Sequence, residues 1–268
     1  MKVYDCFLFY NELDILEIRL NELYDHVDYF YAVEASVTHT GRPKPLYLKE
    51  ALEHTNRFDK FKSKIINIDT DLDLTKSALV DNNIDDSWNR EFIQRNYLMS
   101  VMLKASADDI ILLSDVDEIP SKAFIDARKQ VPKEKYPFIV CKQYFYYYTF
   151  RYAKKELCHG TIAFYRNHIG DMMYQDLRNA RFRLPYVSNA GWHLSFFGSP
   201  ENVKDKIASF SHPEFRGHNN IDTIKKNMES GLDIFNRDNP DEALIKIENN
   251  INVPTYVLNN KEKYKHLF

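Results

Sequence analysis

The three carboxylates Asp115, Asp117 and Glu118 follow directly after an apolar run, residues 110–113, and Pro120 closes the segment. An apolar run of this length is typical of a strand buried on both faces, as in a parallel sheet. Open α/β sheets bind their ligands at the carboxyl ends of such strands. In an extended chain Asp115 and Asp117 point to the same side, where two hard oxygen donors could hold Mg²⁺ or Mn²⁺. The alternative is a solvated acidic turn that leads into the next helix.

The acidic segment does not match the other common acidic or phosphate-binding motifs. As a calcium EF-hand loop it fails, because its sixth position is Pro120 rather than glycine and its twelfth is Asp126 rather than glutamate. No glycine pattern that cradles phosphate lies nearby, and the chain has no Gly-x-Ser-x-Gly elbow. A metal ion that bridges a pyrophosphate remains the favoured interpretation.

Cationic side chains precede the acidic segment on a predicted helix. Arg90 and Gln94 are four residues apart and share one helix face, as do Glu91 and Arg95. The bidentate fork of an arginine fits a diphosphate. The alternative is a Glu91–Arg95 ion pair on a solvated surface.

Two histidines are candidates for the same site. His193, in the segment 191–195, could complete an octahedral metal site begun by Asp115 and Asp117, although a histidine beside a tryptophan is most often a core or rim residue. His212 is a second candidate metal ligand, but the residues around it in the sequence support this role less.

Two further groups of residues allow two interpretations each. Arg178, Arg181 and Arg183 alternate with other residues and suit an anionic donor, a polar acceptor or a solvated edge strand. The aromatic run 144–148 could stack on sugar rings, but such a run is more often core and rim.

The elements that must position these residues begin with a β-α-β-(α)-β-α-β order, the pattern of a nucleotide-binding α/β sheet. Asn11 is the predicted cap of the first helix, and Glu34 ends the second strand. A polar loop, residues 35–46, follows Glu34, and residues 69–86 are expected to form a surface loop or lid. The predicted strands are residues 2–9, 29–33, 64–68 and 110–113, and the predicted helices are residues 13–23, 48–54 and 88–104.

The second half of the chain has a different pattern. Strands are predicted at residues 138–148, 161–166 and 192–197, and no convincing helix separates them, so this half is expected to be mixed or antiparallel. Helices are predicted at residues 121–130, 200–210 and 221–232, and the tail after Pro240 is polar. Because no Pro/Gly/Ser linker is present, a single continuous domain is favoured.

Composition restricts the class of protein. The 268 residues are 44% hydrophobic and 28% charged, which is ordinary for a globular protein, and the net charge of −3 argues against nucleic-acid or anionic-membrane binding. Three widely separated cysteines indicate free thiols rather than a disulfide framework or zinc motif. Neither an apolar stretch of about 18 residues nor a signal-peptide pattern is found. The chain is therefore expected to be soluble and cytoplasmic.

Six segments in order resemble glycosyltransferase family 17, namely residues 5–24, 33–36 with 40–45, 90–96, 113–120, 191–195 and 207–215. The resemblance implies a GT-A-like α/β fold with a mostly parallel central sheet and a mixed C-terminal half. It also implies inversion at the anomeric carbon, Mn²⁺ or Mg²⁺ as cofactor, a glycan acceptor and a UDP-sugar donor, by analogy UDP-N-acetylglucosamine.

The resemblance also suggests roles for residues and for regions. Asp115 and Asp117 match the metal and diphosphate motif of the family. Six further residues that lie in the matching segments are expected to contact the UDP-sugar donor: Glu34, Thr40, Lys44, Arg90, Gln94 and Arg95. Residues 1–120 form the expected nucleotide-sugar half, 121–240 the acceptor half and 241–268 a tail. The eukaryotic members carry a membrane anchor and lumenal stem, and we expect this protein to have neither, which favours a microbial or viral glycan, or a lipid-linked intermediate, as the expected acceptor.

An inverting transfer needs one positioned base, for which Glu118, Asp176 and Glu214 are candidates. Glu214 is favoured because it lies in a matching segment. Two other classes stay open at this point. One is a metal-dependent nucleotidyl- or phosphotransferase that uses the same carboxylates, and the other is a non-catalytic carbohydrate-binding protein.

Overall fold

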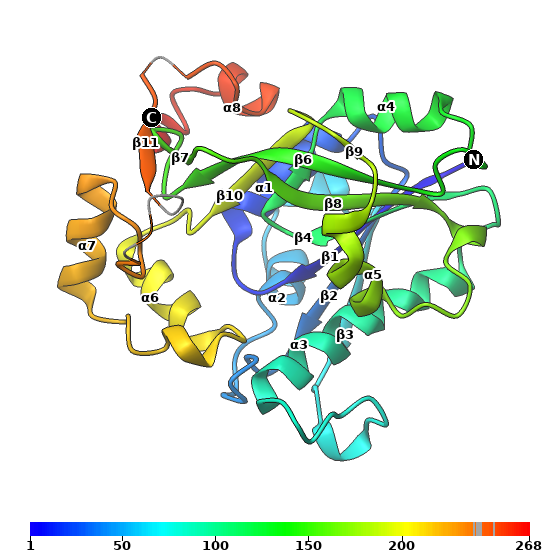
Figure 1. The fold of residues 1–268 in the computed structure, drawn as a ribbon, viewed down its shortest axis with the longest axis horizontal. Helices are drawn as coiled ribbons and strands as arrows, with labels where there is room; N and C mark the ends of the chain where they lie inside the picture. Colours follow the sequence, from blue (N-terminus) through cyan, green and yellow to red (C-terminus); the bar gives the residue numbers. More distant parts are fainter. Residues whose placement is uncertain (238, 240–242, 249) are drawn as a thin grey trace.

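The computed structural model of the chain describes residues 1–237, 239, 243–248 and 250–268. These residues form a mixed sheet of 11 strands with helices on both faces (Figure 1). The predicted α/β class, with a parallel first half and a mixed second half, is confirmed. The expected boundary between acceptor half and tail, at residues 240 and 241, lies outside the described residues. Within the described part of the chain, no helix is both long and apolar enough to cross a membrane.

The first half of the chain builds four parallel strands in the order β4-β1-β2-β3. Alternate residues of β1 pack on opposite faces of the sheet, for example Phe7 with α1 on one face and Cys6 on the other. Both faces are therefore apolar, as the run at 110–113 predicted. The strands are β1 (Val3–Phe9), β2 (Tyr29–Ala35), β3 (Ile65–Thr70) and β4 (Ile110–Asp115).

The second half joins the sheet through an antiparallel pair between β4 and β8. Strand β10 lies between β5 and β6, antiparallel to the first and parallel to the second, which sets His193 opposite Glu118 and Phe145. The strands are β5 (Glu118–Pro120), β6 (Phe138–Tyr147), β7 (Tyr152–Lys154), β8 (Cys158–Tyr165), β9 (Tyr186–Val187), β10 (Gly191–Ser195) and β11 (Leu244–Lys246).

The helices begin where side chains can cap them. Asp85, Ser121, Ser199 and Asn220 accept hydrogen bonds from the first backbone N–H groups of α3, α4, α6 and α7. Helices α6 and α7 lie side by side at one end of the molecule (Figure 1). The helices are α1 (Leu13–Leu23), α2 (Tyr47–His54), α3 (Asp86–Tyr97), α4 (Lys122–Gln130), α5 (Tyr174–Ala180), α6 (Pro200–Ser209), α7 (Ile221–Ser230) and α8 (Thr255–Asn259).

Several local predictions were wrong. The segment Tyr174–Ala180 is helix α5, because Tyr174 and Leu177 are buried at helical spacing, so a helix does separate β8 from β10. Arg178 of this helix and Arg181 and Arg183 of the 3₁₀ turn that follows it therefore do not form an edge strand. The helix predicted at 88–104 ends at Tyr97 and continues as a 3₁₀ segment, and Glu12 rather than Asn11 occupies the N-cap position of α1.

Candidate active site

A cavity of about 380 Å³ lies at the carboxyl ends of β1, β2 and β4, between α3 and α6. One part of its wall is polar and another is aromatic. The charged and amide residues are Glu12, Lys44, Glu91, Gln94, Arg95, Asp115, Asp117, His193, Lys206 and Arg237, together with His39 and His212. The aromatic residues are Phe9, Tyr10, Phe196, Phe210, Phe215 and Phe235.

The Asp115–Glu118 turn is held in place by Arg19, a fully buried residue of α1. Its guanidinium donates to both carboxylate oxygens of Asp5, at 2.7 and 2.6 Å, and to Ser114 Oγ at 2.6 Å. It also donates to the backbone carbonyls of Asp115, Val116 and Glu118, at 3.1, 3.1 and 2.9 Å. A single side chain thus fixes the backbone that carries the acidic motif.

Asp115 ends β4 and is paired with two arginines. Arg95 Nη2 donates to Oδ1 at 3.1 Å, and Arg178 Nη2 donates to Oδ2 at 3.0 Å. Burial raises the pKa of the Asp115 carboxyl, but the two guanidinium groups outweigh burial and lower it to about 2. Residues 116 and 117 form a turn rather than extended chain, so the predicted period-two alignment with Asp117 is wrong, although both carboxylates line the cavity.

We expect this pairing to produce a pH-dependent stability between about pH 4 and pH 2. A carboxyl whose pKa is lower in the folded than in the unfolded state, where it is about 3.9, stabilises the fold above that value and loses the contribution as the pH falls. The melting temperature of the wild type should therefore exceed that of Asp115→Asn at pH 5 and approach it near pH 2. A difference that stays constant over this range would contradict the assignment.

Asp117 is buried and faces a different cation. Lys206 Nζ of α6 donates to Oδ2 at 2.9 Å and also lies 3.1 Å from Glu12 Oε1. His193 Nε2 lies 3.6 Å from Oδ1. Burial raises the pKa of Asp117, but Lys206 and His193 reverse this and hold the pKa well below its usual range. The aspartate is therefore ionised, and α6 brings its counter-charge from the C-terminal half.

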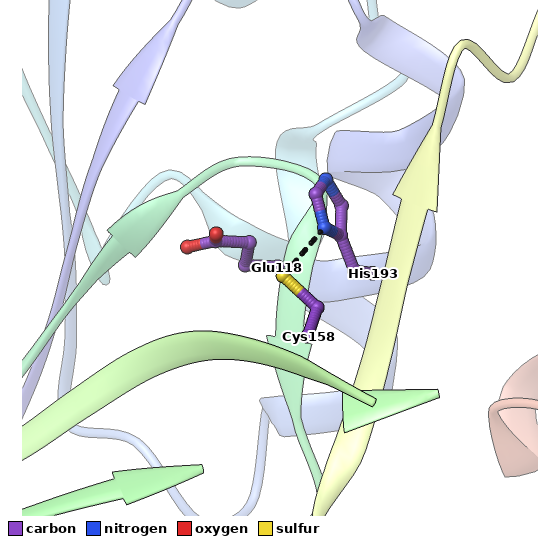
Figure 2. Close-up of side chains that lie close together, drawn as sticks. All are labelled: Glu118, Cys158 and His193. Atoms are coloured by element: carbon purple, nitrogen blue, oxygen red, sulfur yellow. Dashed lines mark hydrogen bonds between the residues drawn. The ribbon is translucent and has the colours of Figure 1, made fainter. Parts of the chain in front are cut away.

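Glu118 is buried behind the cavity and does not line it. Arg178 donates two hydrogen bonds to the Glu118 carboxylate, at 2.8 and 2.5 Å. Figure 2 shows Glu118 with Cys158 and His193, whose Nδ1 lies 3.3 Å from the Cys158 sulfur. Of the described residues, these three are the ones whose metal-type donor atoms lie within 4.8 Å of one another. Because Arg178 is already the ionic partner of Glu118, we do not interpret these three residues as a metal site. We interpret Cys158 and Glu118 as neighbours that hold His193 in position.

The fit of Mn²⁺ or Mg²⁺ can be tested against the donors present. Asp115 and Asp117 offer the hard oxygen ligands that these ions prefer, on one wall of the cavity. Each carboxylate is already paired with basic side chains, which it shares with other carboxylates: Arg95 also contacts Glu91, Arg178 contacts Glu118 and Lys206 contacts Glu12. An ion would compete with these pairings, so the two residues fit an ion that arrives together with an anionic diphosphate. Among the described residues, the ring nitrogens of His193 and the carboxylate oxygens of Asp115 and Asp117 do not all lie within 4.8 Å of one another, so the three do not form a ready metal site.

The residues expected at the donor divide into two sets. Lys44, Gln94 and Arg95 line the cavity, whereas Glu34, Thr40 and Arg90 do not. Glu34 is buried and accepts hydrogen bonds from the first backbone N–H groups of α2, from Leu48 at 3.0 and 3.1 Å and from Lys49 at 3.2 Å. Its geometry is that of a helix-terminus anchor.

Thr40 and Arg90, the other two expected residues that do not line the cavity, hold the loop after β2 in place. Thr40 Oγ1 donates to the carbonyl of Ala208 in α6 at 3.2 Å. Arg90 Nη1 donates to the His39 carbonyl at 3.1 Å, and its guanidinium lies against Gly41, whose φ is +83°. L side chains rarely adopt this φ, so glycine is favoured at position 41, and a Cβ there would also lie 3.2 Å from the Arg90 guanidinium, which would have to shift slightly.

The remaining candidates for the base lie outside the cavity. Asp176 is exposed in the first turn of α5. Glu214 is also exposed, but its carboxylate contacts His212, which does line the cavity. The run 144–148 is divided between core and rim, because Tyr146, Tyr147 and Tyr148 are buried while Tyr144 and Phe145 are half-buried.

Sequence reasoning missed three residues that define the site. Arg19 of α1 and Lys206 of α6 are far from Asp115 and Asp117 in the sequence, and His39 lines the cavity from the loop after β2. Glu91 was considered only as the ion-pair partner of Arg95, a pair that the structure contains at 2.8 Å, and it also lines the cavity. His39 Nε2 lies 2.8 Å from Gln94 Oε1, while Gln94 Nε2 donates to the Val33 carbonyl at 2.9 Å. The amide is thus oriented so that His39 donates from Nε2. Burial lowers the pKa of His39, so a neutral ring faces the cavity.

Comparison with known proteins gives one family and several relatives. The model described as Glycosyltransferase family 17 matches residues 1–268. Beta-1,4-mannosyl-glycoprotein 4-beta-N-acetylglucosaminyltransferase of Homo sapiens is 23% identical over 233 residues, which cover 76% of this chain and 42% of that protein. The proteins of the same name from Rattus norvegicus and Mus musculus are 24% and 23% identical over the same shares. The match spans about two fifths of these curated relatives.

Proposed function

Because the chain belongs to glycosyltransferase family 17, we propose that it transfers N-acetylglucosamine from UDP-N-acetylglucosamine to a hydroxyl of a glycan, with inversion. The relatives are named for this sugar, which supports the choice of donor. The observation that carries the proposal is the Asp115–Glu118 turn, fixed by Arg19 at the edge of a cavity with basic side chains.

The polar wall suits the leaving group of this reaction. A divalent ion held by Asp115 and Asp117 would neutralise charge on the diphosphate as it leaves. Lys206 and Arg95 stand beside those aspartates and line the cavity, so they can stabilise the same developing charge. Under the proposal, residues 1–120 supply most of the donor side of a single domain and Lys206 adds a cation to it, while residues 121–240 otherwise supply the acceptor side.

A binding and turnover assay tests the proposal. UDP-N-acetylglucosamine with Mn²⁺ should raise the melting temperature, and UDP should be released when mannose-containing oligosaccharides are supplied. Removal of the ion with EDTA should lower the rate of UDP release at least about 100-fold, and added Mn²⁺ should restore it. Stabilisation by a nucleoside triphosphate in preference to the UDP-sugar would indicate a nucleotidyl- or phosphotransferase. Oligosaccharide binding without any UDP release would indicate a carbohydrate-binding protein.

A further inference from the structure

The aromatic end of the cavity contains a histidine that the donor site does not use. His212 lines the cavity, and its ring lies 4.5 Å from the ring of Trp88 and 5.2 Å from that of Phe210, between centroids. Phe215 and Phe235 stack beside it with centroids 4.0 Å apart. Aromatic faces of this kind suit the C–H patches of a sugar ring, so the imidazole stands where an acceptor sugar could bind.

The imidazole is oriented by a carboxylate on its outer side. Glu214 Oε1 lies 2.8 Å from His212 Nδ1, and the 3₁₀ turn Pro213–Phe215 holds the two residues in this arrangement. Burial raises the pKa of Glu214, but hydrogen bonds with His212 and with the backbone, together with the charges of His212 and Arg216, outweigh burial and lower it, so the carboxylate is ionised and accepts. Nδ1 therefore carries the proton in the neutral ring, and Nε2 retains its lone pair.

We propose that His212 is the general base of the transfer reaction and that Glu214 is its positioning residue, an inference that rests on the proposed function. The acceptor hydroxyl gives its proton to His212 Nε2 while its oxygen forms a bond to C1 of the donor sugar. The bond between C1 and the diphosphate oxygen breaks at the same time, and its electron pair leaves with UDP. The ionised Glu214 stabilises the imidazolium that results.

The carboxylates on the polar wall are less suited to this role. Glu91 accepts from Arg95 at 2.8 Å and from Ser211, and its pKa is lowered because Arg95 and His39 outweigh burial. Asp115 and Asp117 are also held ionised by basic partners, which makes these three carboxylates weak bases. The fourth carboxylate of the lining, Glu12, is paired with Lys206 at 3.1 Å. The charged and titratable groups on the elements around His212 are Glu214, Arg216, Asp85, Glu91, His218 and Arg237.

Chemical rescue tests the proton-transfer role. His212→Ala should lower the kcat for UDP release from UDP-N-acetylglucosamine by about 10²–10⁴-fold, while binding of the donor, followed by thermal shift, stays unchanged. Added imidazole should restore part of the lost rate, which a purely structural role would not permit. His212→Asn, which keeps the polar contact, is the second variant should the alanine variant fold poorly. The matched control is His266→Ala, because His266 is exposed and is not among the residues that line the cavity.

The positioning role has its own readout. Glu214→Ala should lower kcat about tenfold with little change in KM, and Glu214→Gln, whose amide oxygen still accepts from Nδ1, should recover part of that loss. Unchanged kcat in both His212 variants, or the absence of imidazole rescue, would overturn the inference. Failure of the wild type to bind UDP-N-acetylglucosamine would instead count against the proposed function.

Discussion

Replacing Arg19 with methionine is expected to lower the free energy of unfolding by about 3–5 kcal/mol, because it leaves the buried Asp5 carboxylate without its counter-charge. The variant also removes donors from the carbonyls of Asp115, Val116 and Glu118, which are buried or turned away from solvent around the acidic motif. Urea unfolding followed by circular dichroism measures the change.

The effect should extend to the site itself. Without Arg19 the turn that carries Asp115 and Asp117 loses its anchor to α1, so UDP release at saturating donor should fall even where the variant remains folded. Arg19→Lys keeps the charge, but an ammonium group cannot donate to both oxygens of Asp5 and to three carbonyls at once. The stability of this variant should therefore lie between that of the wild type and that of Arg19→Met.

Arg57→Met provides a matched control for this prediction. Arg57 also pairs with carboxylates of α1, Asp14 and Glu17, but its side chain is 30% exposed and Glu17 has Lys263 as a second cationic partner. Its loss should cost about 1 kcal/mol or less and leave UDP release unchanged. Equal effects of the two substitutions would show that Arg19 does not hold the turn in the way its contacts indicate.

The strands and the acidic motif could be predicted from the sequence because their signals are local. The apolar run at 110–113 identifies a strand buried on both faces, and it ends in carboxylates that do lie at a ligand-sized cavity. The parallel order of the first half follows from strands that alternate with helical stretches. These inferences need no knowledge of residues distant in sequence.

The contacts that define the site could not be predicted, because they join residues far apart in the chain. Lys206 reaches Asp117 across 89 positions, and Arg178 reaches Asp115 across 63. The pattern around Arg178 allowed an edge strand as well as a contact with an anionic donor or polar acceptor, whereas packing of Tyr174 and Leu177 makes it a helix whose arginine contacts the motif. Burial, rather than residue type, decides these assignments.

The role of the aromatic run 144–148 also could not be decided from the sequence. Its residues were candidates for sugar stacking, yet Tyr146 is buried and donates to the Asn252 carbonyl at 2.8 Å. The rings at the cavity come from separate segments, including Phe196, Phe210 and Phe235. Which aromatic side chains face a cavity depends on the tertiary arrangement of α6 and the segments after it.

Asp117→Asn is expected to lower the rate of UDP release by about 10²–10³-fold, because the residue is both a proposed ligand of the ion and the partner of Lys206. The substitution should also cost about 1–3 kcal/mol of stability. This loss is smaller than for an isolated buried ion, since Lys206 keeps Glu12 at 3.1 Å.

A double substitution separates the two effects. In Asp117→Asn with Lys206→Met the ammonium that has lost one of its two carboxylate partners is removed, so the melting temperature should recover part of its loss, although Glu12 then loses its cation. The rate of UDP release should stay low, because the carboxylate that would bind the ion is still missing. The matched control is Asp126→Asn, since Asp126 pairs with His26 at 3.0 Å on the surface of α4. If the double variant regained turnover together with stability, Asp117 would be a structural partner of Lys206 rather than part of the donor site.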